Sequence, residues 1–198
     1  MAIKSFKAKI TGIAPLLQNN PRTVDPFDPF TKKMKKITDK KKKTDDDVQR
    51  MRDIETEAKL YFDEKLGVYV PTRWIMGAIA KNGFALTKIS KAKLRGAVFT
   101  TADKVKLSYS GMELVKSPID IVKNEKFTTI LILPQAQKRL AKSFPIFHDW
   151  SFEFELEYDD SILDREDLVK ILTYSAKYGG FGDFRPSYGR ALVEFYDE

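Results

Sequence analysis

Cysteine is absent from this chain of 198 residues, and there is a single histidine, His148. Without cysteine the protein has no disulfide, no thiolate metal site and no cysteine nucleophile, which is compatible with a reducing cytoplasm. One histidine cannot supply a metal site with several imidazole ligands. We therefore expect neither a metal nor a cofactor, and we interpret His148 as a polar residue at a strand entrance.

Long apolar runs are missing as well. Nothing at the N-terminus resembles a signal peptide, and no stretch approaches the roughly 20 residues that a membrane span needs. Hydrophobic residues make up 42% of the chain and aromatic residues 12%, which is enough for one substantial core. The composition predicts a soluble, cytoplasmic protein with a single domain over residues 1–198.

Positive charge is concentrated in one segment. The net charge is +7, and eight lysines lie between residues 32 and 43, so the rest of the chain is close to neutral. These lysines are Lys32, Lys33, Lys35, Lys36, Lys40, Lys41, Lys42 and Lys43. Pro21, Pro26 and Pro29 interrupt regular structure nearby. The segment predicts a solvated, mobile loop, which could also attract phosphates irrespective of their sequence.

The first half of the chain alternates strand-like and helix-like segments. Residues 3–13 predict a strand, and Thr44 followed by three aspartates predicts the start of a helix. Residues 60–62 and 68–70 flank a turn that contains Gly67, which is typical of a β-hairpin. Residues 72–80 predict a short core helix that ends at Asn82-Gly83.

In the second half, residues 97–122 predict several short strands. The continuous apolar run 127–133 predicts a buried central strand, and residues 134–147 predict a connector. Residues 150–158 alternate between apolar and acidic side chains, so they predict a strand with one buried face. Asp164 predicts the start of another helix, and residues 191–196 form the final strand candidate.

Setting insertions aside, the elements follow the order β-α-β-β-α-β. This order is that of the ferredoxin-like split βαβ arrangement, which RNA-recognition folds also use. The predicted fold class is therefore α+β, ferredoxin-like, or a modified RNA-recognition fold. Two insertions interrupt it: a basic loop with a helix at about residues 19–60, and a β-rich, thumb-like excursion at about residues 97–126.

The segment between the last helix and the last strand is the main functional candidate. It combines glycines (Gly179, Gly180, Gly182, Gly189), arginines (Arg185, Arg190) and aromatic residues (Phe181, Phe184, Tyr188). Glycine lets a partner approach the backbone, and exposed amides, guanidiniums and flat rings together suit a phosphate chain with exposed bases. The alternative is a long turn whose aromatic side chains belong to the core.

Two segments carry a resemblance to a known family. Residues 179–193 resemble the glycine-rich loop and closing strand of the RAMP superfamily, the RNA-binding backbone subunits of CRISPR effector complexes. Residues 67–78, in which Pro71 precedes a helix that contains Gly77, resemble that family's strand and first helix. The two motifs occur in the family's order and cover about thirty residues; the insertions match nothing in the family.

The resemblance implies binding of single-stranded nucleic acid, RNA more than DNA, with head-to-tail self-assembly or assembly with related subunits. The predicted contact residues are Gly179, Gly180, Gly182, Phe184, Arg185, Tyr188, Gly189, Arg190, Arg73, Lys81, Lys41 and Lys42. The sequence is compatible with RNA or single-stranded DNA as the ligand. It is equally compatible with a CRISPR component or a virus-encoded relative.

Two other functions stay open. Some relatives cleave RNA with an aspartate in the first insertion, where this chain has Asp53, Glu55, Glu57 and Asp63; others use a histidine, whereas His148 is far from both motifs. The sequence favours a binding protein over an enzyme, with a metal-dependent ribonuclease as the first alternative. A basic assembly subunit without nucleic acid is the second.

Overall fold

The computed structural model describes residues 3–136 and 138–196. Its main sheet has four antiparallel strands in the order β10 (Ala191–Tyr196), β1 (Ile3–Gly12), β9 (Ser151–Asp159) and β5 (Val98–Thr100). β1 is central, since Lys7 pairs with Tyr196 on one side and with Glu155 on the other. The two strands nearest the C-terminus thus enclose the first one.

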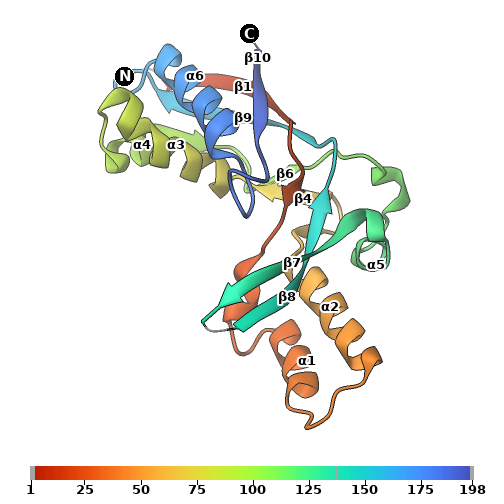
Figure 1. Cartoon of the computed structure of the whole chain (residues 1–198). Helices are drawn as coiled ribbons and strands as arrows, with labels where there is room; N and C mark the ends of the chain where they lie inside the picture. Colours follow the sequence, from red (N-terminus) through yellow and green to blue (C-terminus); the bar gives the residue numbers. More distant parts are fainter. Residues whose placement is uncertain (1–2, 137, 197–198) are drawn as a thin grey trace.

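Three helices accompany this sheet: α3 (Arg73–Thr87), α4 (Lys91–Ala97) and α6 (Arg165–Tyr174) (Figure 1). Along the chain, the elements of this unit follow as β1, α3 with α4, β5, β9, α6 and β10. With the observed strand order, this is the ferredoxin-like arrangement. The predicted α+β fold class is confirmed.

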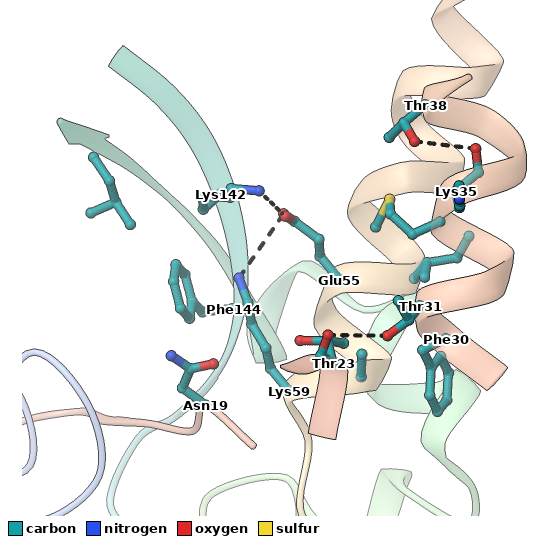
Figure 2. A pocket seen from close by; sticks show the side chains of 14 residues that line it. Asn19, Thr23, Phe30, Thr31, Lys35, Thr38, Glu55, Lys59, Lys142 and Phe144 are labelled. Carbon is teal, nitrogen blue, oxygen red and sulfur yellow. Dashed lines mark hydrogen bonds and ion pairs between the residues drawn. The ribbon is translucent and has the colours of Figure 1, made fainter. Parts of the chain in front are cut away.

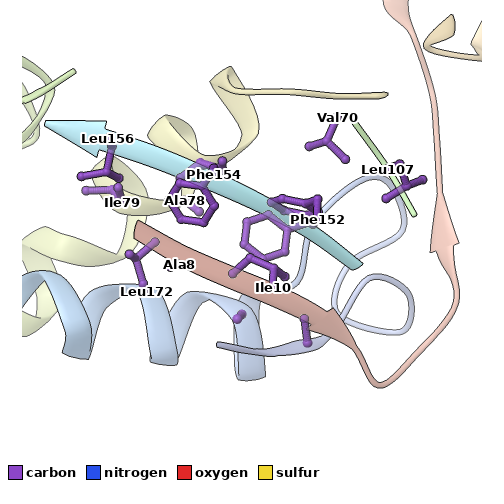
Figure 3. Close-up of a cluster of buried hydrophobic side chains, with 14 of the residues drawn as sticks. Ala8, Ile10, Val70, Ala78, Ile79, Leu107, Phe152, Phe154, Leu156 and Leu172 are labelled. Atoms are coloured by element: carbon purple, nitrogen blue, oxygen red, sulfur yellow. The ribbon is translucent and has the colours of Figure 1, made fainter. Parts of the chain in front are cut away.

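The core lies between the sheet and the helices (Figure 3). Side chains of β9 alternate between buried and more exposed positions, as the sequence predicts, and Phe154 and Leu156 lie on the buried face. Ile10 of β1, Ile79 of α3 and Leu172 of α6 are buried against them. Asp164 caps α6 by accepting a hydrogen bond from the Asp167 amide, as predicted.

The remaining strands form two small antiparallel sheets. One contains β2 (Leu16–Leu17), β8 (Lys138–Phe147) and β7 (Thr128–Gln135), in that order. The other contains β3 (Phe62–Asp63), β4 (Gly67–Pro71) and β6 (Lys104–Lys106). β3 and β4 form the predicted hairpin.

A pair of helices, α1 (Pro29–Thr38) and α2 (Asp45–Lys59), lies next to the β7–β8 hairpin, away from the main sheet (Figure 1). Thr44 is the N-cap of α2, as the sequence predicts, and it forms a capping box with Asp47. Short helical turns complete the chain: Pro21–Val24, Met112–Leu114, α5 (Pro118–Val122), Glu125–Phe127 and Ser175–Gly179. No helix within residues 3–136 and 138–196 is long and apolar enough to cross a membrane.

The prediction of a mobile loop over the lysine run is wrong for its first part, which is α1. Asp28 accepts a hydrogen bond from the Phe30 amide at 2.8 Å, and Pro29 occupies the first helical turn. Proline is tolerated there because the amide it lacks has no partner within the helix. Only the lysines from Lys40 to Lys43 lie in the connection to α2.

The prediction of a buried central strand at residues 127–133 is also wrong. β7 pairs only with β8 among the described strands, so it is an edge strand, and the expected connector 134–147 is mostly β8. Ile130 is 45% exposed and Ile132 is 67% exposed. One face of this apolar strand therefore lies on the surface, whereas Leu131 and Leu133 pack against the small cluster of Leu17, Phe144 and Ile146.

Two helix predictions need correction as well. α3 does not end at Gly83 but continues to Thr87, because Gly83 is a packing position: a Cβ there would lie 2.5 Å from Cδ1 of Leu94. Within the excursion, β5 and β6 are strands, whereas residues 112–114 and 118–122 are helical. The insertion boundaries and the single-domain organisation remain predictions.

Candidate nucleic-acid interface

The glycine loop, residues 179–190, is held by backbone hydrogen bonds to residues 15–17, which include β2. The Gly189 amide donates to the Pro15 carbonyl at 2.8 Å, and the Asp183 amide donates to the Leu17 carbonyl at 3.0 Å. The Gly180 amide donates to the carbonyl of Ser175 at 2.7 Å. The amides of Gly180 and Gly189, which we expected to face phosphates, are therefore already engaged within the protein.

Glycine is needed in this loop for close contact between chain segments. Gly180, Gly182 and Gly189 all have φ between +72° and +76°, a region that side chains with a Cβ rarely adopt. A Cβ on Gly189 would lie 1.8 Å from the Phe181 carbonyl oxygen, and a Cβ on Gly182 would lie 2.3 Å from that of Leu17. These distances leave no room for a Cβ at Gly182 or Gly189.

The three aromatic side chains of the loop differ in their surroundings. Phe181 is buried and meets Phe152 edge-to-face at 5.6 Å between ring centroids, so it is a core residue. Phe184 is half-buried and packs edge-on against Phe144 at 5.2 Å. Tyr188 is also half-buried. Of the three, Phe184 and Tyr188 keep an accessible surface for a base, whereas Phe181 does not.

Arg185 and Arg190 are exposed. Within residues 3–136 and 138–196, neither guanidinium takes part in a hydrogen bond, an ion pair or a cation–π contact. Surface arginines often pair with nearby carboxylates, so two unpaired guanidiniums on a rigid loop leave both available to an external anion.

A second set of candidates forms a line along α3, which we call the α3 stripe: Arg73, Gly77 and Lys81. Residues four apart lie on the same face of a helix, and all three are exposed. Apart from the adjacent residues and the backbone of α3 itself, no described atom lies within 4 Å of where a Cβ on Gly77 would be. Arg73 donates to the Tyr61 hydroxyl at 2.6 Å, which holds its guanidinium in place. The stripe presents bare backbone between two cations.

The α3 stripe and the glycine loop are neighbours. Asn82, next to Lys81, donates to the Ser175 hydroxyl at 2.8 Å, and its Nδ2 is 3.4 Å from the Cβ position of Gly179. At the other side of the loop, Asn19 donates to the Asp183 carboxylate at 2.7 Å. The loop therefore connects the α3 stripe to the helical insertion.

Lys41 and Lys42 lie elsewhere. They are exposed in the connection between α1 and α2, at the end of the helical pair that is remote from the main sheet (Figure 1). Their neighbour Lys40 forms an ion pair with Asp47 at 2.6 Å. The structure thus separates these two lysines from the other predicted contact residues.

The open face of the main sheet is predominantly acidic. β1 contributes two lysines to it, whereas β9 and β10 contribute four glutamates: Lys7, Lys9, Glu153, Glu155, Glu157 and Glu194. One of the lysines is paired, since Lys7 lies 3.8 Å from Glu155. This face carries more negative than positive charge, which is unfavourable for phosphate binding.

The acids considered for catalysis are dispersed. Asp53 pairs with Lys123, Glu55 pairs with Lys142, and Asp63 pairs with Lys104. The hydrogen bond from Lys104 is the main cause that lowers the pKa of Asp63 to about 2. Glu57 is half-buried.

Within the described part of the chain, no three carboxylate or imidazole groups converge to hold a metal ion. His148 is exposed in the turn between β8 and β9, and its backbone carbonyl accepts a hydrogen bond from the Ser110 amide. The geometry therefore offers no assembled set of ligands around the acids that the sequence singled out.

No protein-family model matches the chain, and no curated protein matches it. Solved structures do: one match is the crystal structure of Cmr6 from Pyrococcus furiosus, which aligns with 98% of this chain and all of that chain. The TM-score is 0.40 and the sequence identity is 12%.

Proposed function

We propose that this protein binds single-stranded nucleic acid, RNA in preference to DNA, along the α3 stripe and the glycine loop. The observation that carries this proposal is the pair of exposed guanidiniums, Arg185 and Arg190, on a loop whose backbone is hydrogen-bonded to the rest of the protein. Arginines on a backbone that is already ordered suit phosphate oxygens, because the loop itself loses little conformational entropy when they bind.

The α3 stripe extends the same surface. Arg73 and Lys81 flank the bare backbone at Gly77, where a sugar–phosphate chain could approach the helix closely. Phe184 and Tyr188 provide partly exposed rings for bases next to the arginines. The acidic open face of the sheet directs a polyanion to this side of the molecule.

We further propose that the chain is a RAMP-type subunit and that copies assemble head to tail along the strand. The exposed apolar side chains of Ile130 and Ile132, on an edge strand, provide a surface that a neighbouring subunit could cover. Sedimentation velocity with an RNA of increasing length should then show complexes that grow in steps of one protein mass.

The direct test is fluorescence anisotropy with a labelled single-stranded RNA and with DNA of the same sequence. The double variant Arg185→Ala/Arg190→Ala should bind at least about tenfold more weakly, and its salt slope should fall by about 1.4, because each single-strand phosphate contact contributes about 0.7. The matched control is Arg50→Ala/Arg95→Ala, which removes the same charge from two other exposed positions.

If both double variants lose the same RNA affinity, the loss comes from the change in net charge alone. That result would contradict the proposed site. Tight binding that survives Arg185→Ala/Arg190→Ala would exclude these arginines. If no nucleic acid binds at physiological salt, the assembly subunit becomes the better hypothesis. Cleavage of RNA with Mg²⁺ that Asp63→Asn abolishes would instead support the ribonuclease.

A further inference from the structure

We propose that the cavity between α1, α2 and the β7–β8 hairpin binds a nucleoside phosphate, either free or as one nucleotide of a bound strand. This inference goes beyond the proposed function, because the cavity is separate from the glycine loop and could bind a mononucleotide on its own. Figure 2 shows the cavity, with Phe144 on the hairpin side and Phe30 on the side of α1.

The cavity has the size of a small-molecule site. Its volume is about 540 Å³, within the range of about 300–1,000 Å³ that is usual for ligand pockets. Its apolar wall consists of Phe30, Met34, Ile54, Ala58, Leu133 and Phe144. A flat, mostly apolar group such as a base fits a wall of this kind, which two aromatic rings flank.

The charge of the lining favours an anion. Three lysines line the cavity, Lys35, Lys59 and Lys142, against one carboxylate, Glu55. Glu55 is already engaged, because it pairs with Lys142 at 2.6 Å and accepts a hydrogen bond from the Ser143 amide at 3.0 Å. Lys35 is exposed and forms no ion pair within the described residues. A phosphate would supply the missing negative charge.

Lys59 is positioned by its surroundings rather than by a partner charge. Its ammonium donates to the Ser143 carbonyl at 2.6 Å and lies 3.5 Å above the centre of the Phe144 ring, whereas the Glu55 carboxylate is 4.0 Å away. Burial lowers the pKa of Lys59 to about 8. A phosphate next to this amine would therefore gain a counter-ion in a partly dehydrated site.

The rim supplies polar groups and a route to the glycine loop. Asn19 lines the cavity and donates to Asp183 of the loop, two residues before Arg185. Its amide carries further hydrogen-bonding capacity for a base edge or a phosphate oxygen. A strand that contacts Arg185 could accordingly place a neighbouring nucleotide in the cavity.

Isothermal titration calorimetry on the full chain tests this inference, with adenosine and uridine 5′-monophosphates, adenosine and inorganic phosphate as separate probes. A mononucleotide should bind with a Kd of about 1 mM or below, and more tightly than either adenosine or phosphate. The variant Lys35→Ala should weaken it at least about fivefold, whereas Lys36→Ala, a neighbouring exposed lysine that does not line the cavity, should leave it unchanged.

The pH dependence provides a second readout. Lys59 faces Glu55 on its own helix, Lys142 on β8 and Asp183 on the glycine loop. With a pKa of about 8, the amine is mostly charged at pH 7 and mostly neutral at pH 9, so affinity for the phosphate should fall about tenfold over this interval. The variant Lys59→Met should bind weakly and lose the pH dependence.

A blocking variant, Met34→Trp, separates the two sources of the nucleotide, with circular dichroism to check the fold. If mononucleotides bind and Met34→Trp prevents it, the cavity is a free-nucleotide site. If only a labelled strand responds to Met34→Trp and Lys35→Ala, the cavity holds one nucleotide of that strand. If neither probe responds, the inference is overturned, and the arginine test of the proposed function is unaffected.

Discussion

Gly77 lies in the middle of α3 with empty space where a side chain would be. Glycine in a helix interior lowers stability by about 1 kcal/mol relative to alanine, and no packing contact within the described residues explains its presence. Gly77→Ala should therefore raise the free energy of unfolding by up to about 1 kcal/mol while it weakens RNA binding, because the methyl group keeps the phosphate chain away from the helix.

Gly96→Ala provides the control. Gly96 is an exposed glycine in α4 that also has no neighbour within 4 Å of its Cβ position. Urea unfolding should show a gain for both variants, and anisotropy should show weaker binding for Gly77→Ala alone. Unchanged RNA affinity in Gly77→Ala would remove the α3 stripe from the interface.

The burial of the Lys59 amine should make the free energy of unfolding depend on pH. Its side chain is 13% exposed, and burial lowers its pKa from 10.5 to about 8. Between these values the unfolded chain binds more protons than the folded one, so the free energy of unfolding rises with pH in this window. From pH 7.5 to pH 10, wild type should gain about 2 kcal/mol relative to Lys59→Met.

Urea unfolding of both proteins at the two pH values measures that difference. Titration of groups remote from Lys59 affects both proteins alike and cancels in the comparison. A constant difference between wild type and Lys59→Met would mean that the amine is effectively solvated in the folded protein, and it would also remove the reason for a pH-dependent phosphate affinity at the cavity.

At the scale of elements, the sequence predicts a helix or strand correctly where its local pattern is compatible with only one kind of element. β9 follows from its alternation and α6 from the cap at Asp164. The start of α1 also had a local signal, Asp28 followed by Pro29, but the charge of the lysine run suggested a loop. The prediction for β7 was wrong for a different reason: an apolar run of seven residues, 127–133, has the same pattern in a buried strand and in an exposed edge strand.

The candidate site was predictable only in part. The glycines and arginines of residues 179–190 are close in sequence, so their grouping is visible without a structure. Asn19 and Asp183 are 164 positions apart, and the burial of Lys59 beside Phe144 depends on how α2 packs against the hairpin. No pattern of spacing in one sequence indicates such contacts, so the cavity was not expected.

The close packing of the glycine loop should make the stability of the protein sensitive to substitution of its glycines. Gly189→Ala should lower the free energy of unfolding by about 2–4 kcal/mol, because a Cβ there meets the Phe181 carbonyl and the backbone has a positive φ. Gly67→Ala is the matched control: Gly67 has φ +75° but no neighbour within 4 Å, so it should cost only about 1–2 kcal/mol. Thermal unfolding compares the two, and equal losses would contradict the close packing.

At the scale of the whole molecule, charge assigns opposite roles to two surfaces. The open sheet face carries an excess of glutamate, and the loop side carries unpaired arginines. Lys7→Ala/Lys9→Ala, which removes two positive charges from the sheet face, should therefore change RNA affinity less than about twofold at physiological salt. A loss as large as that of Arg185→Ala/Arg190→Ala would place the nucleic acid on the sheet instead.

The position of β1 has a consequence for biosynthesis. Both of its partners, β9 and β10, lie within residues 151–196. The carbonyls of Pro15 and Leu17 accept hydrogen bonds from Gly189 and Asp183, which belong to the same part of the chain. While the ribosome is still producing the middle of the polypeptide, the first strand has two unsatisfied edges, a state that invites aggregation. The surface proposed to bind RNA would accordingly be completed only after residue 196 has been synthesised, because the glycine loop lies between β9 and β10 in the chain.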